Sequence, residues 1–295
     1  MKQLFICLSI LCLAGNIIGQ TFTEKISKTY KFDKKSDQNA ILVYNISGDV
    51  FIEGISGDQI ILEVVKTINA KTEERLARGK SEIQLGVLDR ADSLIFFVEG
   101  TGQEFGWNTW SKKDSENNHW GYSWQRNNHR EDQGYDYKMS FKLKVPNQVH
   151  VVASTINDGN VMVSNTLGEV NANNINGNIV LEKIAGATQA STINGDVDIT
   201  YSKNPSSDCR YYSLNGHVKV NFPSSISATM SFKSFNGDLY TNVESLETMS
   251  PMVSKTSTSK GVKYKVEMDR FKIRSGGPHL DVETFNGDAY IKELK

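Results

Sequence analysis

The sequence has too few cysteines to be held together by disulfides. Of its three cysteines, Cys7 and Cys12 lie in the first nineteen residues, which leaves Cys209 alone in the rest of the chain. We therefore expect no disulfide within that part, and we interpret Cys209 as a packed thiol because no base lies near it in sequence. Proline is also scarce, with 5 residues against 23 glycines. Such a composition is typical of one ordered body with many turns.

An excess of charge of either sign is missing as well. The chain has 33 basic and 34 acidic residues, mixed along its length, and a net charge of −1. This balance excludes the electrostatic footprint of a protein that binds nucleic acid or an anionic membrane. No apolar run reaches the ~20 residues that a transmembrane helix needs. We expect no nucleic-acid partner and no transmembrane segment.

The first nineteen residues have the order of a secretory signal peptide. A basic start at Lys2 is followed by an apolar run over residues 4–13 and by small residues up to Gly19. The other interpretation is a buried N-terminal helix. We predict a signal peptide over residues 1–19 and export to the periplasm, the outer cell envelope or the extracellular space.

Glycine recurs every nine residues in the middle of the chain, at Gly159, Gly168, Gly177, Gly186 and Gly195. The two residues before each glycine alternate between two types. One type is Asn-Asp-Gly or Ile-Asn-Gly, and the other is Thr-Leu-Gly or Ile-Ala-Gly. The repeat unit therefore has eighteen residues and two turns. Further Asn-Gly copies follow at spacings of twenty-one residues and again near the C-terminus. The nine-residue step also separates Gly48 from Gly57.

Each copy continues with alternating apolar residues, as in residues 192–199. Alternation predicts a half-buried strand, and Asn-Gly tolerates positive φ. Two arrangements fit: an antiparallel meander with Asn-Gly hairpins, or a β-solenoid whose parallel strands stack ~4.8 Å apart. We favour the solenoid, with coils of about 18–21 residues, because alternate turns differ. The predicted structural turn residues are Asn176, Gly177, Asn194, Gly195, Asn215, Gly216, Asn236, Gly237, Asn286 and Gly287.

Stacking of equivalent positions predicts an interior column and a ladder of amides at one corner. The column consists of Val161 and Val163, Ile179 and Leu181, Val197 and Ile199, Val218 and Val220, and Leu239 and Thr241. The ladder consists of Asp158, Asn176, Asn194, Asn215, Asn236 and Asn286. The apolar residue before each Asn, such as Ile193, points inward if the strand runs straight and outward if the corner resets the alternation. We favour the inward direction.

Two segments depart from the repeat and divide the chain. Residues 20–99 hold the first repeats and a short helix over residues 72–78, with Thr72 as its cap and Gly79 as its stop. Strands are expected over residues 83–88 and 94–98. Residues 100–137 hold all four tryptophans and almost no aliphatic residue, which predicts a long surface loop. Repeats fill residues 138–295.

Residues 41–50, 141–146, 154–199 and 276–291, in this order, resemble the DUF4097-like and head GIN domain group of exported, adhesin-like bacterial proteins. The resemblance covers most of the chain beyond residue 19, except the Trp-rich segment. It implies a single-stranded, right-handed parallel β-helix, and right-handed is also the usual hand of parallel crossovers. It implies no catalytic residues.

No pattern of residues points to a metal or a cofactor, and we predict neither. Calcium-binding β-rolls repeat doubled glycines, which are missing here, so Asp49, Asp196, Asp238 and Asp288 are interpreted as solvated turn acids. The five histidines are interpreted as surface residues because no acid or thiol accompanies them at metal-ligand spacing.

The rival to a binding module is a polysaccharide hydrolase or lyase. Asp196 and Asp198 lie two apart on one strand face, about 6.5–7 Å, which suits paired carboxylates in glycoside hydrolysis. Equivalent positions in neighbouring coils are not acidic, so ordinary outward polarity is the favoured interpretation.

Aromatic rings among amides suit sugar faces or a protein partner. The candidate ligand-binding residues are Trp107, Trp110, Trp120 and Trp124. The alternative is that these rings cover the side of the solenoid. We predict an exported, non-catalytic, adhesin-like binding or structural module of the cell envelope. Its partner is an unidentified glycan or a surface protein, and a third hypothesis has end strands pairing between copies.

Overall fold

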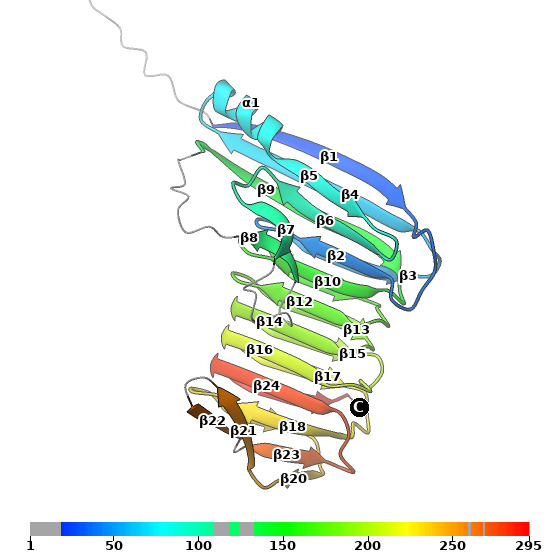
Figure 1. Ribbon diagram of the computed structural model, residues 1–295, viewed down its shortest axis with the longest axis vertical. Coiled ribbons are helices and arrows are strands. Elements are labelled where there is room, and N and C mark those ends of the chain that lie inside the picture. The colour runs from blue at the N-terminus through cyan, green and yellow to red at the C-terminus, as the bar shows by residue number, and fades with distance from the viewer. Residues whose placement is uncertain (1–18, 109–118, 124–132, 259–260, 268, 295) are drawn as a thin grey trace, which may run out of the picture.

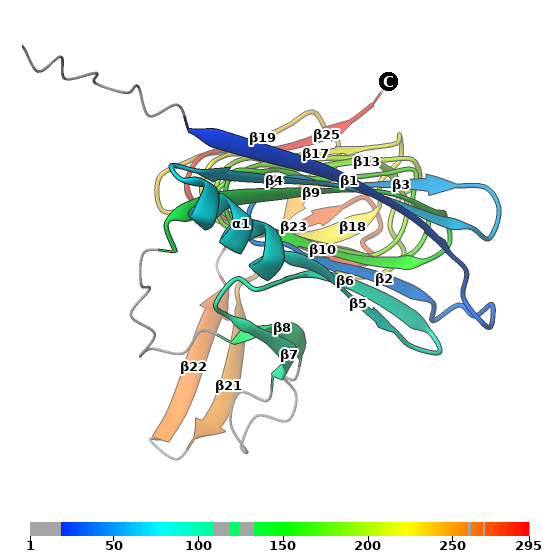
Figure 2. The ribbon, with the colours of Figure 1, turned by 90° about the horizontal axis from the view of Figure 1, so that it is seen from above.

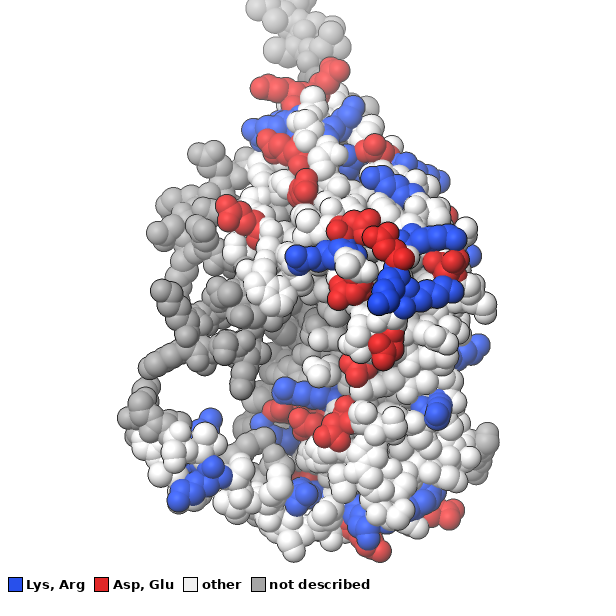
Figure 3. Space-filling view, turned by 45° about the vertical axis from the view of Figure 1, so that its right-hand side comes forward, with Lys and Arg blue, Asp and Glu red and all other residues white. Residues whose placement is uncertain are grey.

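The computed structural model describes residues 19–108, 119–123, 133–258, 261–267 and 269–294. These residues are mostly β-strand, and the one helix among them is α1 (Glu73–Glu82). Two large sheets lie face to face, and two short hairpins project from one side of them (Figures 1 and 2). Basic and acidic side chains are interspersed on the face drawn in Figure 3. The predicted all-β class with one short helix is confirmed.

We call the two large sheets sheet A and sheet B. Sheet A has the order β1 (Gln20–Tyr30), β4 (Ile60–Ala70), β9 (Tyr135–Pro146), β3 (Val50–Ile55), β11 (Val161–Ser164), β13 (Ile179–Ile184), β15 (Val197–Tyr201), β17 (Val218–Phe222), β25 (Ala289–Glu293), β19 (Leu239–Thr241). Sheet B has the order β20 (Leu246–Thr248), β23 (Arg270–Ile273), β18 (Ala228–Lys233), β24 (His279–Asn286), β16 (Cys209–Asn215), β14 (Thr188–Asn194), β12 (Val170–Asn174), β10 (His150–Thr155), β2 (Ala40–Tyr44), β6 (Ser93–Glu99), β5 (Gln84–Asp89). The hairpins are β7 (Glu104–Asn108) with β8 (His119–Ser123), and β21 (Met252–Thr258) with β22 (Gly261–Glu267).

A strand of sheet B and the strand of sheet A that follows it form a unit that we call a layer. The layers are β2/β3, β10/β11, β12/β13, β14/β15, β16/β17, β18/β19 and β24/β25. In sheet A, Val161 aligns with Ile179, Ile179 with Val197, and Val197 with Val218, in steps of 18, 18 and 21 residues. These pairings are parallel. The predicted parallel stacking is therefore confirmed on both sides of Asn194-Gly195, and the antiparallel meander is excluded.

The C-terminal layer breaks the sequence order of the stack. β24 pairs with both β16 and β18, and β25 pairs with both β17 and β19. Layer β24/β25 therefore lies between β16/β17 and β18/β19, although it follows both in sequence (Figure 1). We expected successive windings to lie one on top of another, and this expectation is wrong at the C-terminal end.

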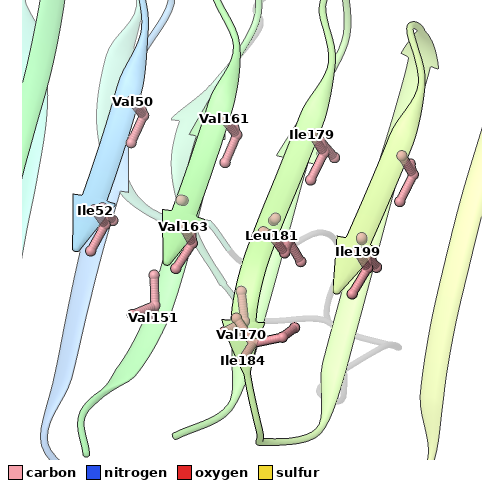
Figure 4. Close-up of a cluster of buried hydrophobic side chains, with 14 of the residues drawn as sticks. Val50, Ile52, Val151, Val161, Val163, Val170, Ile179, Leu181, Ile184 and Ile199 are labelled. Carbon is pink, nitrogen blue, oxygen red and sulfur yellow. The ribbon is translucent and has the colours of Figure 1, made fainter. Parts of the chain in front are cut away.

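The core is the narrow space between the two sheets. Val50, Val161 and Ile179 form one column in sheet A, and Ile52, Val163, Leu181 and Ile199 form a second (Figure 4). Fully burying one such side chain stabilises the fold by about 1.5–3 kcal/mol, and each layer can bury its own only against its neighbours. The predicted core residues are buried as far as Val220, but Leu239 is half-buried and Thr241 is exposed, because β19 is the edge strand of sheet A.

The Asn-Gly corners form a continuous amide ladder. Each Asn Nδ2 donates to the Oδ1 of the Asn in the layer before it, at 2.8–3.0 Å. The ladder runs in the order Asn157, Asn176, Asn194, Asn215, Asn286, Asn236. Its first member is Asn157 and not the predicted Asp158, which has a positive φ of 55°.

The corner glycines are required by close packing between layers. A Cβ on Gly195 would overlap the carbonyl oxygen of Gly177, and one on Gly216 would overlap that of Gly195. Among the glycines of the Asn-Gly corners, Gly287 has a positive φ. The others, Gly177, Gly195, Gly216 and Gly237, do not. The expectation that Asn-Gly serves positive φ is therefore wrong at most corners.

The apolar residue before each ladder Asn points outward, which corrects the inward direction that we favoured. The exposed residues at this position include Ile175, Ile193, Phe235 and Phe285. The rings of Phe235 and Phe285 stack with their centres 4.8 Å apart. The corner resets the alternation, because the chain turns from sheet B into sheet A at the Asn and the strand does not run straight.

Antiparallel strands and α1 close the N-terminal end of the stack. β9 pairs with β3 in parallel and with β4 in the antiparallel sense, and β4 pairs with β1. The Thr72 side chain caps α1 by accepting from the N–H of Arg75 at 3.3 Å, as predicted. Gly79 does not stop the helix, which continues to Glu82. A Cβ there would press on Ile68 and Tyr135, so Gly79 lets α1 approach the sheet.

Other predicted segments have mixed outcomes. Strands β5 and β6 confirm the strands expected over residues 83–88 and 94–98. The predicted signal peptide lies outside the described residues apart from Gly19. The segment 100–137, predicted to be a surface loop, contains the β7–β8 hairpin and the beginning of β9.

Candidate functional site

The outer face of sheet B carries two columns of side chains, because the register aligns every second residue of neighbouring strands. One column is Phe97, Tyr44, Ser154, Asn173, Ser191, Tyr212, Glu283, Lys233. The other is Ile95, Leu42, Val152, Asn171, Gln189, Arg210, Asp281, Ser231. Along the stack the face changes from apolar and aromatic, through an amide zone, to a charged zone.

The β7–β8 hairpin packs on the aromatic zone. The Phe105 ring stacks on Phe97 at 4.2 Å and contacts Tyr44 at 5.3 Å. Phe97 is 7% exposed although it is on the outer face of the sheet. Part of the Trp-rich segment therefore covers the side of the sheets, as one of our two interpretations expected.

Tyr122 of β8 ties the hairpin to the backbone of the sheet. Its hydroxyl accepts from the N–H of Val98 at 2.8 Å and lies 3.0 Å from the Val98 carbonyl oxygen and 3.2 Å from that of Tyr44. Burial raises the pKa of Tyr122 well above its usual range, and burial also raises the pKa of Tyr44 to about 12. Both phenols are therefore neutral near pH 7, and Tyr122 keeps a proton to donate.

The hairpin presents two tryptophans above this anchor. Trp107 is 53% exposed, and its ring meets that of Trp120 edge-on at 5.5 Å. Trp120 is half-buried between Phe105 and the guanidinium of Arg90, which lies 5.1 Å from the ring. Trp110 and Trp124, the other two candidate ligand-binding residues, lie outside the described residues.

A shallow cleft of about 300 Å³ lies over the amide zone. Its walls come from β12, β14 and β16 and include Asn171, Asn173, Gln189, Ser191 and Tyr212. Asn173 Nδ2 donates to Asn171 Oδ1 at 2.8 Å, which fixes both amides. In sheet B, β12 is two strands away from β2, so the cleft begins about 10 Å from the strand that carries Tyr44, on which the hairpin packs.

Arg210 forms the charged end of the cleft. Its guanidinium lies 3.6 Å from the carboxylate of Asp281 and 3.7 Å from that of Glu283. Glu283 also pairs with Lys233 at 2.6 Å, and Asp281 accepts from the Ser231 hydroxyl at 3.0 Å. These partners hold a half-exposed cation at the margin of the amide zone.

Of the acids weighed as catalytic or calcium-binding candidates, all but Asp198 belong to a second ladder. Asp196 Oδ1 accepts from the backbone N–H of His217 at 2.8 Å, and Asp49, Asn160, Asn178, His217 and Asp288 accept from the next layer in the same way. Asp196 therefore joins two layers through a hydrogen bond, whereas we had interpreted it as an ordinary outward-facing polar residue. Asp198 lies beside Lys219 on sheet A. In the described part of the chain, no group of three or more His, Cys, Asp or Glu side chains could hold a metal ion.

The predicted turn residues do not contribute to the cleft. They line the corner where sheet B passes into sheet A, and their amides bond to one another. Sequence reasoning missed the cleft residues because Asn171, Gln189 and Arg210 are the variable outward positions of the strands. The repeat period could have found them, since it aligns these three positions in successive layers.

Comparison with known proteins identifies no family, since no family model and no curated protein matches the chain. Three solved structures are similar over 92% of the chain. They are a proposed cell adhesion protein from Clostridium sporogenes (10% identity, all of that chain, TM-score 0.41), a proposed adhesin from Bacteroides fragilis (12%, 97%, 0.27) and a proposed lipid-binding protein from Parabacteroides distasonis (12%, 97%, 0.22). At these identities and TM-scores the likenesses assign no function to the chain. Among the described residues, no helix is both long and apolar enough to cross a membrane.

Proposed function

We propose that the protein is an exported, non-catalytic, adhesin-like binding module of the cell envelope, and that the outer face of sheet B binds a glycan. One observation carries the proposal: the exposed Trp107 stands on a hairpin anchored beside a cleft of ordered amides. Residues 1–19, with their signal-peptide pattern, support export.

The chemistry of the face suits a sugar chain. Sugars present apolar C–H faces, which pack on aromatic rings, and hydroxyl groups, which need both donors and acceptors. Trp107 and Trp120 supply the rings, and the cleft amides supply donors and acceptors on the same side chain. Few precisely placed polar groups in a concave site give orientation and specificity.

The proposal includes the finer form of the fold. The layers form a right-handed β-solenoid of the kind that the DUF4097-like and head GIN domain resemblance implies. Parallel pairing from β3 to β17, with one register shift between Glu182 and Ile184, supports it. A site on stacked strands is positioned more precisely than a site on loops, which suits a display module.

A glycan array probed with the chain lacking residues 1–19 tests the site. We expect Trp107→Ala to weaken binding about tenfold or more, as for an exposed aromatic anchor at the centre of an interface. Phe235→Ala is the matched control, because Phe235 is an exposed ring, 73% accessible, on a different part of the surface. A Trp107→Ala protein that binds every glycan as tightly as the wild type would contradict the proposal. Deletion of residues 101–136 is a poorer test, since it would uncover Phe97 and Tyr44.

The non-catalytic part is tested by incubation with soluble polysaccharides and analysis of the products. We expect no cleavage by the wild type. Cleavage that disappears in Asp196→Asn, while circular dichroism shows an intact fold, would replace the binding module with a hydrolase or lyase.

A further inference from the structure

A second concave site lies away from sheet B's outer face, where three loops meet. The loops are residues 31–39 between β1 and β2, 56–59 between β3 and β4, and 147–149 between β9 and β10. They enclose a pocket of about 380 Å³, within the range of sites that hold small ligands. The loops lie on the right-hand side of Figure 1, and Figure 3 brings that side forward. The candidate site above shares no residue with the pocket.

The pocket combines an apolar wall with polar side chains that solvent can reach. Phe32, Pro146 and Val149 form the wall, and Phe32 and Val149 also pack against the core. Asn147 and Gln148 line the pocket with side chains that make no hydrogen bond within the described residues. Amides of this kind can donate and accept, which suits a ligand with hydroxyl groups.

The charge of the pocket favours an anion. Lys31 pairs with Asp58 at 3.2 Å, while Lys35 lines the pocket without an ion pair among the described residues. Two ammonium groups against one carboxylate leave a net charge of +1. The hydrogen bond from Lys31 lowers the pKa of Asp58, so this carboxylate stays charged near neutral pH and Lys31 stays occupied. The more distant charge of Lys35 also lowers this pKa, but Lys35 has no carboxylate within ion-pair distance among the described residues, so it is the cation better placed to meet a ligand.

We propose that this pocket binds a ring-shaped organic carboxylate of the uronic acid class. The apolar face of the ring lies on Phe32 and Pro146, the hydroxyls meet Asn147 and Gln148, and the carboxylate meets Lys35. This inference does not rest on the proposed function, because it concerns a different surface.

Isothermal titration with D-glucuronate, D-glucose and acetate tests the site on the chain lacking residues 1–19. We expect glucuronate to bind measurably, with a Kd on the order of 1 mM, and glucose and acetate to bind at least about tenfold more weakly. Glucose lacks the carboxylate that meets Lys35, and acetate lacks the ring that lies on the apolar wall. Equal binding of glucose removes the role of Lys35, and equal binding of acetate removes the role of the apolar wall. Failure of glucuronate to bind at ~20 mM overturns the proposal.

Three variants locate the site. Lys35→Gln should weaken glucuronate binding about three- to tenfold, as expected for a charge-assisted hydrogen bond at a solvated site. Lys34→Gln is the matched control, because Lys34 is an exposed neighbour that does not line the pocket, and it should leave binding unchanged. Asp58→Asn should tighten binding, because it frees Lys31. If Lys34→Gln weakens binding as much as Lys35→Gln, the effect is general charge and the assignment is wrong.

Discussion

The stacked layers and the β21–β22 hairpin are both β-structure, but they differ in what surrounds their side chains. In β15, Val197 and Ile199 are completely buried between neighbouring layers. In the hairpin, Val253 and Tyr264 are 60% and 61% exposed, and each strand has one partner strand. An isolated two-stranded hairpin is marginally stable in water, whereas each inner layer is stabilised from both sides. Stability therefore resides in the interfaces between layers and much less in the individual strands.

The largest expected effect comes from removing the intercalated layer. A chain without residues 277–295 loses the burial of Leu280, Val282 and Ile291, each worth about 1.5–3 kcal/mol, and leaves β16 and β18 without a common neighbour. A loss on the order of 5 kcal/mol or more approaches the whole stability of a domain, so we expect the truncated chain to be unfolded by circular dichroism.

The contrasting deletion removes the hairpin. Replacing residues 251–268 by a short Gly-Ser linker should change the free energy of unfolding by no more than about 0.5 kcal/mol, because the described side chains of β21 and β22 are exposed. Both deletions are compared by urea denaturation. If they lower the free energy of unfolding equally, the stacked layers contribute no more to stability than the hairpin does.

A single methyl group at a corner is expected to have the next largest effect. In Gly195→Ala the added Cβ overlaps the Gly177 carbonyl oxygen, and we expect a loss of about 3 kcal/mol from overpacking. Gly106→Ala in β7 is the control, since no atom lies within 4 Å of the added Cβ and φ is not positive. It should be neutral or slightly stabilising. A neutral Gly195→Ala in thermal unfolding would show that the layers can separate at the corner.

The amide ladder is expected to contribute less. Asn194→Ala removes the bonds to Asn176 and Asn215, and we expect a loss of about 1 kcal/mol because the amides are exposed. Asn173→Ala, an exposed amide with a single bond to Asn171, should lose less than about 0.5 kcal/mol. If both variants have the same midpoint in urea, the ladder adds nothing to stacking.

The smallest effect concerns the pH dependence of stability at the end of β25. Hydrogen bonds from Arg274, at 2.6 and 2.8 Å, and from the Ile226 N–H lower the pKa of Glu293. A lowered folded-state pKa means that this stabilisation is present above the unfolded value of about 4.3 and is lost as pH falls through the folded value. Glu293→Gln should therefore be less stable at pH 7 and lose less stability during acid titration. The acid loss should not vanish, because a hydrogen bond from the Asp238 N–H also lowers the pKa of Asp288. If the free energy of unfolding of Glu293→Gln falls with pH as steeply as that of the wild type, the Arg274–Glu293 pair does not contribute to the loss of stability in acid.

Periodicity predicted the repeat because it depends on local sequence. The spacing of Gly177, Gly195 and Gly216 predicted the parallel register, and alternation predicted that Val197 and Ile199 are buried. The direction of Ile193 could not be predicted, since it depends on where the backbone turns at the corner. Of the candidate site, the aromatic segment was predicted, and the cleft of amides was not, because its residues share a strand position but no residue type.

By itself, the sequence determined the repeat period and the alternation of buried positions, and it favoured parallel stacking over an antiparallel meander because alternate turns differ. Tertiary structure alone decided three features. It placed β24/β25 between two earlier layers, laid Phe105 and Tyr122 on sheet B beside the amides, and brought three loops together around Lys35. Each of these depends on contacts between segments far apart in the chain, which are set by the shape and exposed edges of the assembled sheets and not by any local pattern.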